Sequence, residues 1–284
     1  MDLKNEKPDS AHLAHVRNMI AKLVQKFQPL QIICFGKRTF LTECSGSFIP
    51  LAANLEGNYC LLMVTEGPAQ NAHEVQDFAN AHFKQGWMTI LCHSQESVSE
   101  SIELNSRFFI GVYTHGQLLY SRDGLSNFDF AFRFDPRLAA AKSLKHFENR
   151  IALADGFLQG AAECFANRQY NVSTFMLHQV VEQCCIALLR VYLDYRLHIH
   201  NLHRALRLCG CFSDRPLKLF DSGGLNDPRL LDLLIKSYSQ SRYKDDFVVI
   251  QEDADRLYDR VCSFVDLTKE MCRDKIESLK TEVF

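Results

Sequence analysis

One stretch of the sequence, Tyr170 to His203, constrains the fold more than any other. From Phe175 to Leu193 it is apolar on almost every face, and its polar interruptions are Gln179, Glu182, Gln183 and Arg190. A helix that is apolar all round has to be covered on all sides, by a bundle or by a partner chain. The second half of the chain is therefore predicted to be a bundle built around this helix. The surplus apolar surface of Cys184–Leu193 predicts a homodimer through the same half.

The core helix leads into a histidine cluster, His198, His200 and His203, with Cys209 and Cys211 close behind. His200 and His203 are three residues apart on an expected helix, which suits two ligands of a zinc ion. Cys-Gly-Cys is not a common spacing for structural zinc, so the favoured interpretation is that these histidines cap or pack. We expect no metal site and no cofactor, with zinc as the alternative at this cluster. His178, alone on the apolar helix, is predicted to be a hydrogen-bonded core residue.

Composition limits the classes of function. The 284 residues carry a net charge of −2, so any contact with nucleic acid must come from a local patch rather than from overall charge. No apolar run of about 18 residues is free of polar breaks, so no membrane span is expected. The first 15 residues resemble neither a secretory signal nor a transit peptide. Eleven cysteines without the rhythm of a disulfide scaffold predict a reducing, cytoplasmic location.

The first half of the chain alternates helices and strands. Helices are predicted at 10–27, with Ser10 as the N-cap, at 71–84 and at 97–104. Strands are predicted at 31–35, 59–64, 87–92, 108–113 and 118–120, with turns at 36–38 and 114–117. This alternation predicts an α/β domain with a mixed, largely covered sheet over residues 1–135.

The second half is almost purely helical. The expected helices are 138–167, 171–195, 201–208, 229–239 and 253–279, and residues 213–228 are expected to form a loop. An all-α bundle of four to five helices is therefore predicted for residues 136–284.

Several short motifs occur in a suggestive order. Phe35-Gly36-Lys37-Arg38 follows the first strand, and Gln179-Val-Val-Glu182 lies in the core helix. His200-Asn201-Leu202 and Ser241-Arg-Tyr-Lys-Asp245 follow later. The ordered set resembles a minimal nucleotidyltransferase domain fused to a HEPN domain, over nearly the whole chain. In that resemblance Gln179, Glu182 and His200 are marks of the HEPN bundle.

The resemblance implies a degenerate transferase site. Members of the family hold metal ions with an Asp-x-Asp pair, and those positions correspond here to Asn58 and Cys60, which cannot supply paired anionic oxygens to Mg²⁺. The serine of the family turn is Lys37. Gly36, Lys37 and Arg38 remain candidates for binding a phosphate, although a solvated basic turn accounts for the same residues.

HEPN ribonucleases pair an arginine with a histidine four to six residues later, across a dimer. Arg242 stands at the arginine position, yet no histidine follows it; Arg242 and Tyr243 are candidates for contact with a nucleotide or phosphate. We therefore expect a non-catalytic nucleotidyltransferase–HEPN protein that binds a nucleotide, RNA or a partner protein as a homodimer. The alternative is a HEPN-type ribonuclease or toxin-like enzyme, using Arg196 with His203 or Arg242 with a histidine from elsewhere.

Overall fold

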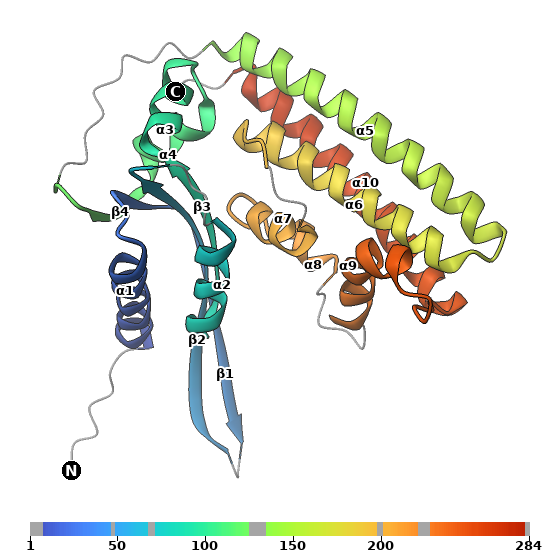
Figure 1. Ribbon diagram of the computed structural model, residues 1–284, viewed down its shortest axis with the longest axis horizontal. Helices are drawn as coiled ribbons and strands as arrows, with labels where there is room; N and C mark the ends of the chain where they lie inside the picture. The colour runs from blue at the N-terminus through green and yellow to red at the C-terminus, as the bar shows by residue number, and fades with distance from the viewer. Residues whose placement is uncertain are drawn as a thin grey trace. The chain divides into compact units, whose positions relative to one another are not determined.

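A computed structural model describes residues 8–46, 49–67, 72–124, 135–197, 201–220 and 228–281. The chain divides into two compact units, Met1–Phe132 and Arg133–Phe284 (Figure 1). The first contains a mixed four-stranded sheet with helices and the second is helical, so the predicted fold class is confirmed.

The sheet of the first unit has the order β3-β2-β1-β4. Its strands are β1 (Gln31–Gly46), β2 (Ile49–Thr65), β3 (Gly86–Ser94) and β4 (Gln117–Ser121). β1 runs antiparallel to both β2 and β4, whereas β2 and β3 are parallel. The run Tyr59–Val64 of β2 is buried throughout, as expected of a central strand covered on both faces.

Helices cover both faces of this sheet. α1 (Pro8–Phe27) and α2 (Ala72–His82) share a core with the strands, through residues such as Leu23, Val75 and Leu61. α3 (Gln95–Glu103) follows β3 directly, and its Val98 and Ile102 are buried. α4 (Arg107–His115) lies on the Ile33 side of β1, where its aromatic rings pack against the sheet.

Three local predictions for this unit are wrong. Residues 108–113 form a helix, α4, rather than a strand, because a short apolar run does not distinguish the two and here four of its residues are buried on a helix. Gly36-Lys37-Arg38 is not a turn, because β1 continues through it to Gly46. The helix α1 begins at Pro8, so Ser10 lies inside the helix and not at its N-cap.

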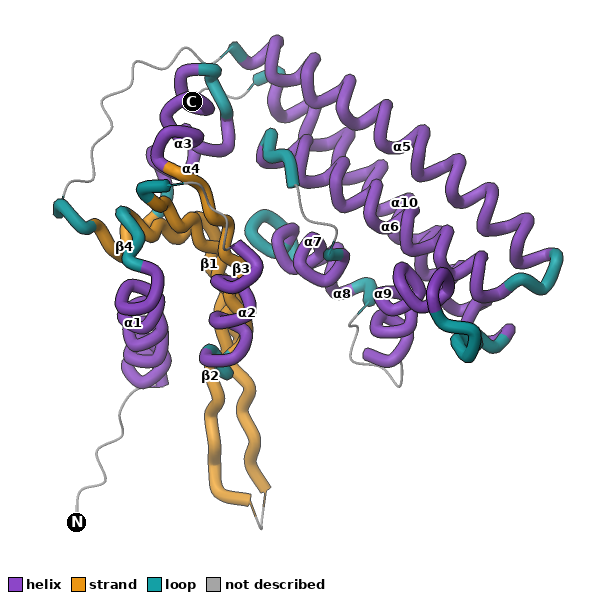
Figure 2. Tube along the Cα trace, viewed as in Figure 1, coloured by secondary structure: helices purple, strands orange, loops and turns teal. Residues whose placement is uncertain are grey.

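β1 and β2 extend far beyond their neighbours in the sheet. β3 pairs with β2 from Gly57 onward, and β4 pairs with β1 only over Gln31–Cys34. In the part of the chain that the structure describes, residues 38–46 and 49–56 therefore pair with each other alone, as a two-stranded ribbon (Figure 2).

The second unit is a bundle built around one helix. Its elements are α5 (Pro136–Ala166), α6 (Tyr170–Leu193), α7 (Leu202–Cys209), α8 (Arg215–Lys218), α9 (Pro228–Tyr243) and α10 (Gln251–Leu279). α5, α6 and α10 run alongside one another, and α6 also contacts α7 and α9 (Figure 1). The predicted loop 213–228 contains the short helix α8, and Phe220 after it is fully buried against Phe264.

α6 is covered inside its own unit. Val180, Cys184 and Leu188 have no exposed surface, and the structure thus shows no surplus of apolar surface on the central part of the helix. The predicted surplus on Cys184–Leu193 is therefore wrong, whereas the homodimer itself stays a prediction. The same burial explains why α6, although long and apolar enough to cross a membrane, is the core helix of a bundle; no membrane span is indicated.

Candidate functional site

The candidate residues of the first unit are brought together by the pairing of β1 with β2. Gly36 lies opposite Cys60, and Arg38 lies opposite Asn58. Because side chains alternate along a strand, Asn58 and Cys60 share the sheet face opposite Tyr59. The positions expected for a transferase turn and its Asp-x-Asp pair are thus neighbours, on strands rather than beside a turn.

The chemistry of this neighbourhood is poor in anionic ligands. Cys60 is buried, and burial raises the pKa of the adjoining Cys34 thiol to about 11, so that thiol is protonated at neutral pH. Among the residues that the structure describes, no group of three or more histidines, cysteines, aspartates or glutamates could hold a metal ion. His198 and His200 of the histidine cluster lie outside the described residues.

On the opposite face, Tyr59 links the sheet to α1. Its hydroxyl lies 2.8 Å from Nε2 of His12, and both side chains are buried. The ammonium of Lys37, an exposed residue, lies 5.9 Å from the centre of the Tyr59 ring. Lys37 therefore lies on a strand, with its charge near the ring of Tyr59. Its candidate role in phosphate binding stays a prediction.

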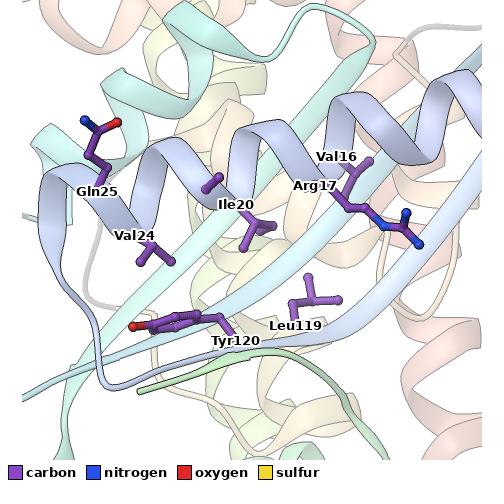
Figure 3. A pocket seen from close by; sticks show the side chains of 8 residues that line it. Val16, Arg17, Ile20, Val24, Gln25, Leu119 and Tyr120 are labelled. Atoms are coloured by element: carbon purple, nitrogen blue, oxygen red, sulfur yellow. The ribbon is translucent and has the colours of Figure 1, made fainter. Parts of the chain in front are cut away.

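A groove of about 460 Å³ lies between α1 and the edge strand β4 (Figure 3). Figure 3 shows Ile20 and Val24 of α1 facing Leu119 and Tyr120 of β4, with Arg17 toward one end. Among the described residues that line it, Arg17 is the one cation, the rest of the surface is mostly apolar, and no pair of groups suits acid–base chemistry.

The candidate residues of the second unit form a more distinctive arrangement. The guanidinium carbon of Arg242 lies 4.3 Å from the ring centre of Tyr238, 5.1 Å from that of Tyr243 and 5.6 Å from that of Phe175. Its Nε donates a hydrogen bond to the backbone oxygen of Tyr238, at 2.7 Å, which fixes the plane of the guanidinium. We call Arg242, Phe175, Tyr238 and Tyr243 the arginine–aromatic cluster.

This cluster is open to solvent. Arg242 is exposed, and 77% of the Tyr243 surface is accessible. Within the described residues Arg242 forms no ion pair. An exposed arginine held among aromatic rings can take a phosphate at its remaining N–H groups and a planar base against the rings.

His178 packs against the buried side of Tyr238, one of the residues of the arginine–aromatic cluster. Its side chain is 2% exposed, its ring centre lies 5.0 Å from that of Tyr238, and the side-chain amide of Gln179 lies 3.2 Å from its Nδ1. Burial, and secondly the charge of Arg242, lower the pKa of His178 to about 4. The prediction of a hydrogen-bonded core histidine is thus confirmed, and the ring is neutral at physiological pH.

The remaining predicted residues are distributed along the bundle. Gln179 is half-buried on α6 and Glu182 is buried one turn later. Arg196 is exposed after the end of α6, whereas His203 is half-buried in the first turn of α7. His200 lies outside the described residues.

Two of the aromatic partners of Arg242, Tyr238 and Phe175, are not among the residues predicted from the sequence. Tyr238 precedes Arg242 by one helical turn, and this i, i+4 spacing is a signal that could have been found. Phe175 and His178 are on another helix, α6, and only the packing of α9 against α6 brings them to Arg242.

A model of the HEPN domain family matches residues 147–271. The match runs from α5 into α10, so the helical unit contains a HEPN domain and this part of the predicted resemblance is confirmed. A HEPN domain is compatible with a function involving nucleotides or RNA. The match does not extend to the first unit, whose likeness to nucleotidyltransferases stays a prediction. A search of curated proteins found none that matches the chain.

Proposed function

We propose that this protein binds a nucleotide or an RNA strand at the arginine–aromatic cluster of its HEPN domain and does not cleave it. The observation behind the proposal is the exposed guanidinium of Arg242 among three aromatic rings. Unpaired bases stack on aromatic side chains and arginine planes, and arginine hydrogen-bonds phosphate in a forked geometry.

The state of His178 supports binding without cleavage. A general acid or base must lie within hydrogen-bond reach of the reacting group, and His178 is buried beneath Tyr238. No histidine occurs between Arg242 and the start of α10 in the sequence. The site therefore has a cation and stacking surfaces but no accessible imidazole within the cluster.

For the first unit we propose a nucleotidyltransferase-like domain that has lost its activity. The neighbouring positions of Gly36, Asn58 and Cys60 support the likeness, and the absence of carboxylates at 58 and 60 supports the loss. The purified protein should incorporate no labelled nucleotide into itself or into RNA in the presence of Mg²⁺.

The homodimer and a cytoplasmic location belong to the same proposal. The cysteines described by the structure are all free thiols, which supports a reducing compartment. The dimer can be measured directly by sedimentation at micromolar concentration, where a monomer would refute it.

The binding experiment compares variants of the two exposed cluster residues. Arg242→Gln and Tyr243→Ala should each weaken the binding of a fluorescent adenine nucleotide by about tenfold, the equivalent of one charge-assisted hydrogen bond or one stacked base. Lys236→Gln on the same helix is the matched control, because Lys236 is paired with Asp232 outside the cluster. Equal affinities for all three variants would refute the proposal.

The proximity of His178 to Arg242 favours one second candidate, a ribonuclease that uses this pair. It predicts cleavage of labelled RNA by the wild-type protein that disappears in His178→Gln. We expect intact RNA after prolonged incubation in both cases.

A further inference from the structure

A row of basic side chains lies along α5 and α6, away from the arginine–aromatic cluster. Lys142, His146 and Arg150 are spaced four residues apart on α5 and therefore share one face of that helix. Arg190 of α6 lies close enough to alter the pKa of His146. We call these four residues the basic row.

The antiparallel packing of α5 on α6 holds the row in place. Nζ of Lys142 lies 2.7 Å from a carboxylate oxygen of Asp194, at the end of α6. Nη1 of Arg150 donates a hydrogen bond of 2.9 Å to the side-chain oxygen of Gln183. These two contacts fix the ends of the row against the same stretch of α6.

Positive charge exceeds negative charge in this region. Burial lowers the pKa of Arg190; Asp194 opposes this, whereas Arg196 and Arg150 add to it. Arg190 is half-buried and, within the described residues, makes no ion pair. Burial, and then the charge of Arg190, also lower the pKa of His146 below its ordinary value. Lys142, Arg150 and Arg190 carry three positive charges around the carboxylate of Asp194, and such a cluster attracts an added anion.

One side of α6 runs from the arginine–aromatic cluster to the basic row. Phe175, Gln179, Gln183, Ile186 and Arg190 follow one another at spacings of three or four residues, so they line one side of the helix. Four of them are half-buried, whereas Gln183 is buried, with 8% of its surface exposed. From Phe175 to Arg190 this face is about 22 Å long, at a rise of roughly 1.5 Å per residue.

We infer that the basic row is a second phosphate site, and that the ligand is a single-stranded oligonucleotide lying along α6 from Arg242 to Arg190. This inference rests on the proposed function and extends it. A mononucleotide is too short to reach both ends, so the second site distinguishes a strand from a free nucleotide. The half-buried amide of Gln179 lies between the ends and supplies a polar contact without charge.

The test compares ligands of two lengths on two variants. The probes are fluorescent adenosine monophosphate and a fluorescent oligoadenylate of about eight nucleotides, within the site sizes typical of single-strand binding. The double variant Lys142→Gln/Arg190→Gln removes charge from the row. The control is Arg273→Gln, an exposed arginine on α10, because α10 packs on another face of α6 through Tyr192.

The double variant should bind the oligonucleotide about tenfold or more weakly. The slope of its affinity against salt concentration should also be smaller, by about 0.7 for each phosphate that the variant no longer neutralises. It should bind the mononucleotide as the wild type does. Arg190→Lys, which keeps the charge, should retain most of the oligonucleotide affinity, and circular dichroism checks that each variant is folded.

Three results would overturn the inference. If the double variant binds the oligonucleotide as tightly as Arg273→Gln does, the basic row is not a phosphate site, and only the proposed binding at Arg242 stands. If an acidic peptide displaces the labelled oligonucleotide at the same concentration as unlabelled oligoadenylate, the row is a protein-binding surface instead. If the wild type binds neither probe, the proposed function fails together with the inference.

Discussion

At the scale of single residues, His178 is a base kept neutral by its surroundings. Its pKa of about 4 in the folded protein lies below the ordinary 6.5 of an exposed histidine. Between pH 6.5 and 4 the unfolded chain therefore binds a proton that the folded chain does not, and stability falls as the pH falls. The contribution of neutral His178 to the free energy of unfolding is fully present above pH 6.5. It is lost as the pH falls toward 4, and the loss amounts to at most about 3 kcal/mol.

Urea unfolding at several pH values measures this effect. Between pH 6.5 and 4, we expect the free energy of unfolding of His178→Gln to fall less than that of the wild type. His73→Gln, at an exposed position on α2, should keep the wild-type slope. Parallel pH profiles for the wild type and His178→Gln would contradict the assignment.

The sequence alone predicts only some of the residues of the candidate site. Arg242 and Tyr243 are predicted from the resemblance to the HEPN pattern, in which an arginine is expected before the last helix. Phe175 and His178 were not connected with them, since their contact depends on how α9 packs on α6. In the basic row, the spacing of Lys142, His146 and Arg150 on α5 is visible in the sequence, whereas the position of Arg190 beside them depends on the packing of α5 on α6.

At the scale of elements, regular periodicity decided which predictions held. The helices at 8–27, 170–193 and 251–279 have long apolar patterns, and all were predicted close to their observed bounds. The run Phe108–Tyr113 was assigned to a strand because a short apolar run fits either structure. Its burial against the sheet as α4 is a tertiary effect that no local pattern contains.

The start of β3 has a strict steric requirement. Gly86 has φ of +106°, and a Cβ at this position would lie 2.2 Å from the carbonyl oxygen of Gly57 on β2. Gly86→Ala should therefore destabilise the first unit by more than about 2 kcal/mol. Gly111→Ala, in the open middle of α4, should instead stabilise it by about 0.5–1 kcal/mol. Thermal unfolding of both variants checks the pair, and equal shifts would contradict the steric argument.

At the scale of the whole molecule, each unit has its own core. The core of the first lies between its sheet and helices, and that of the second is centred on α6. We therefore expect a fragment of residues 133–284 to fold alone, with the helical circular dichroism and cooperative melting of a bundle. A fragment without a cooperative transition would show that the helical unit depends on the first.

The ribbon of β1 and β2 also bears on the order in which the first unit folds. Its two strands are neighbours in the chain, so a short loop closure is enough to form it. β4 can pair with β1 only after residues 66–116 have been synthesised, since Gln31 pairs with Ser121. During synthesis β1 and β2 can therefore pair before β4 exists, and one edge of β1 is then unpaired. This unpaired edge is where a nascent chain of this protein is most exposed to pairing with the wrong strand.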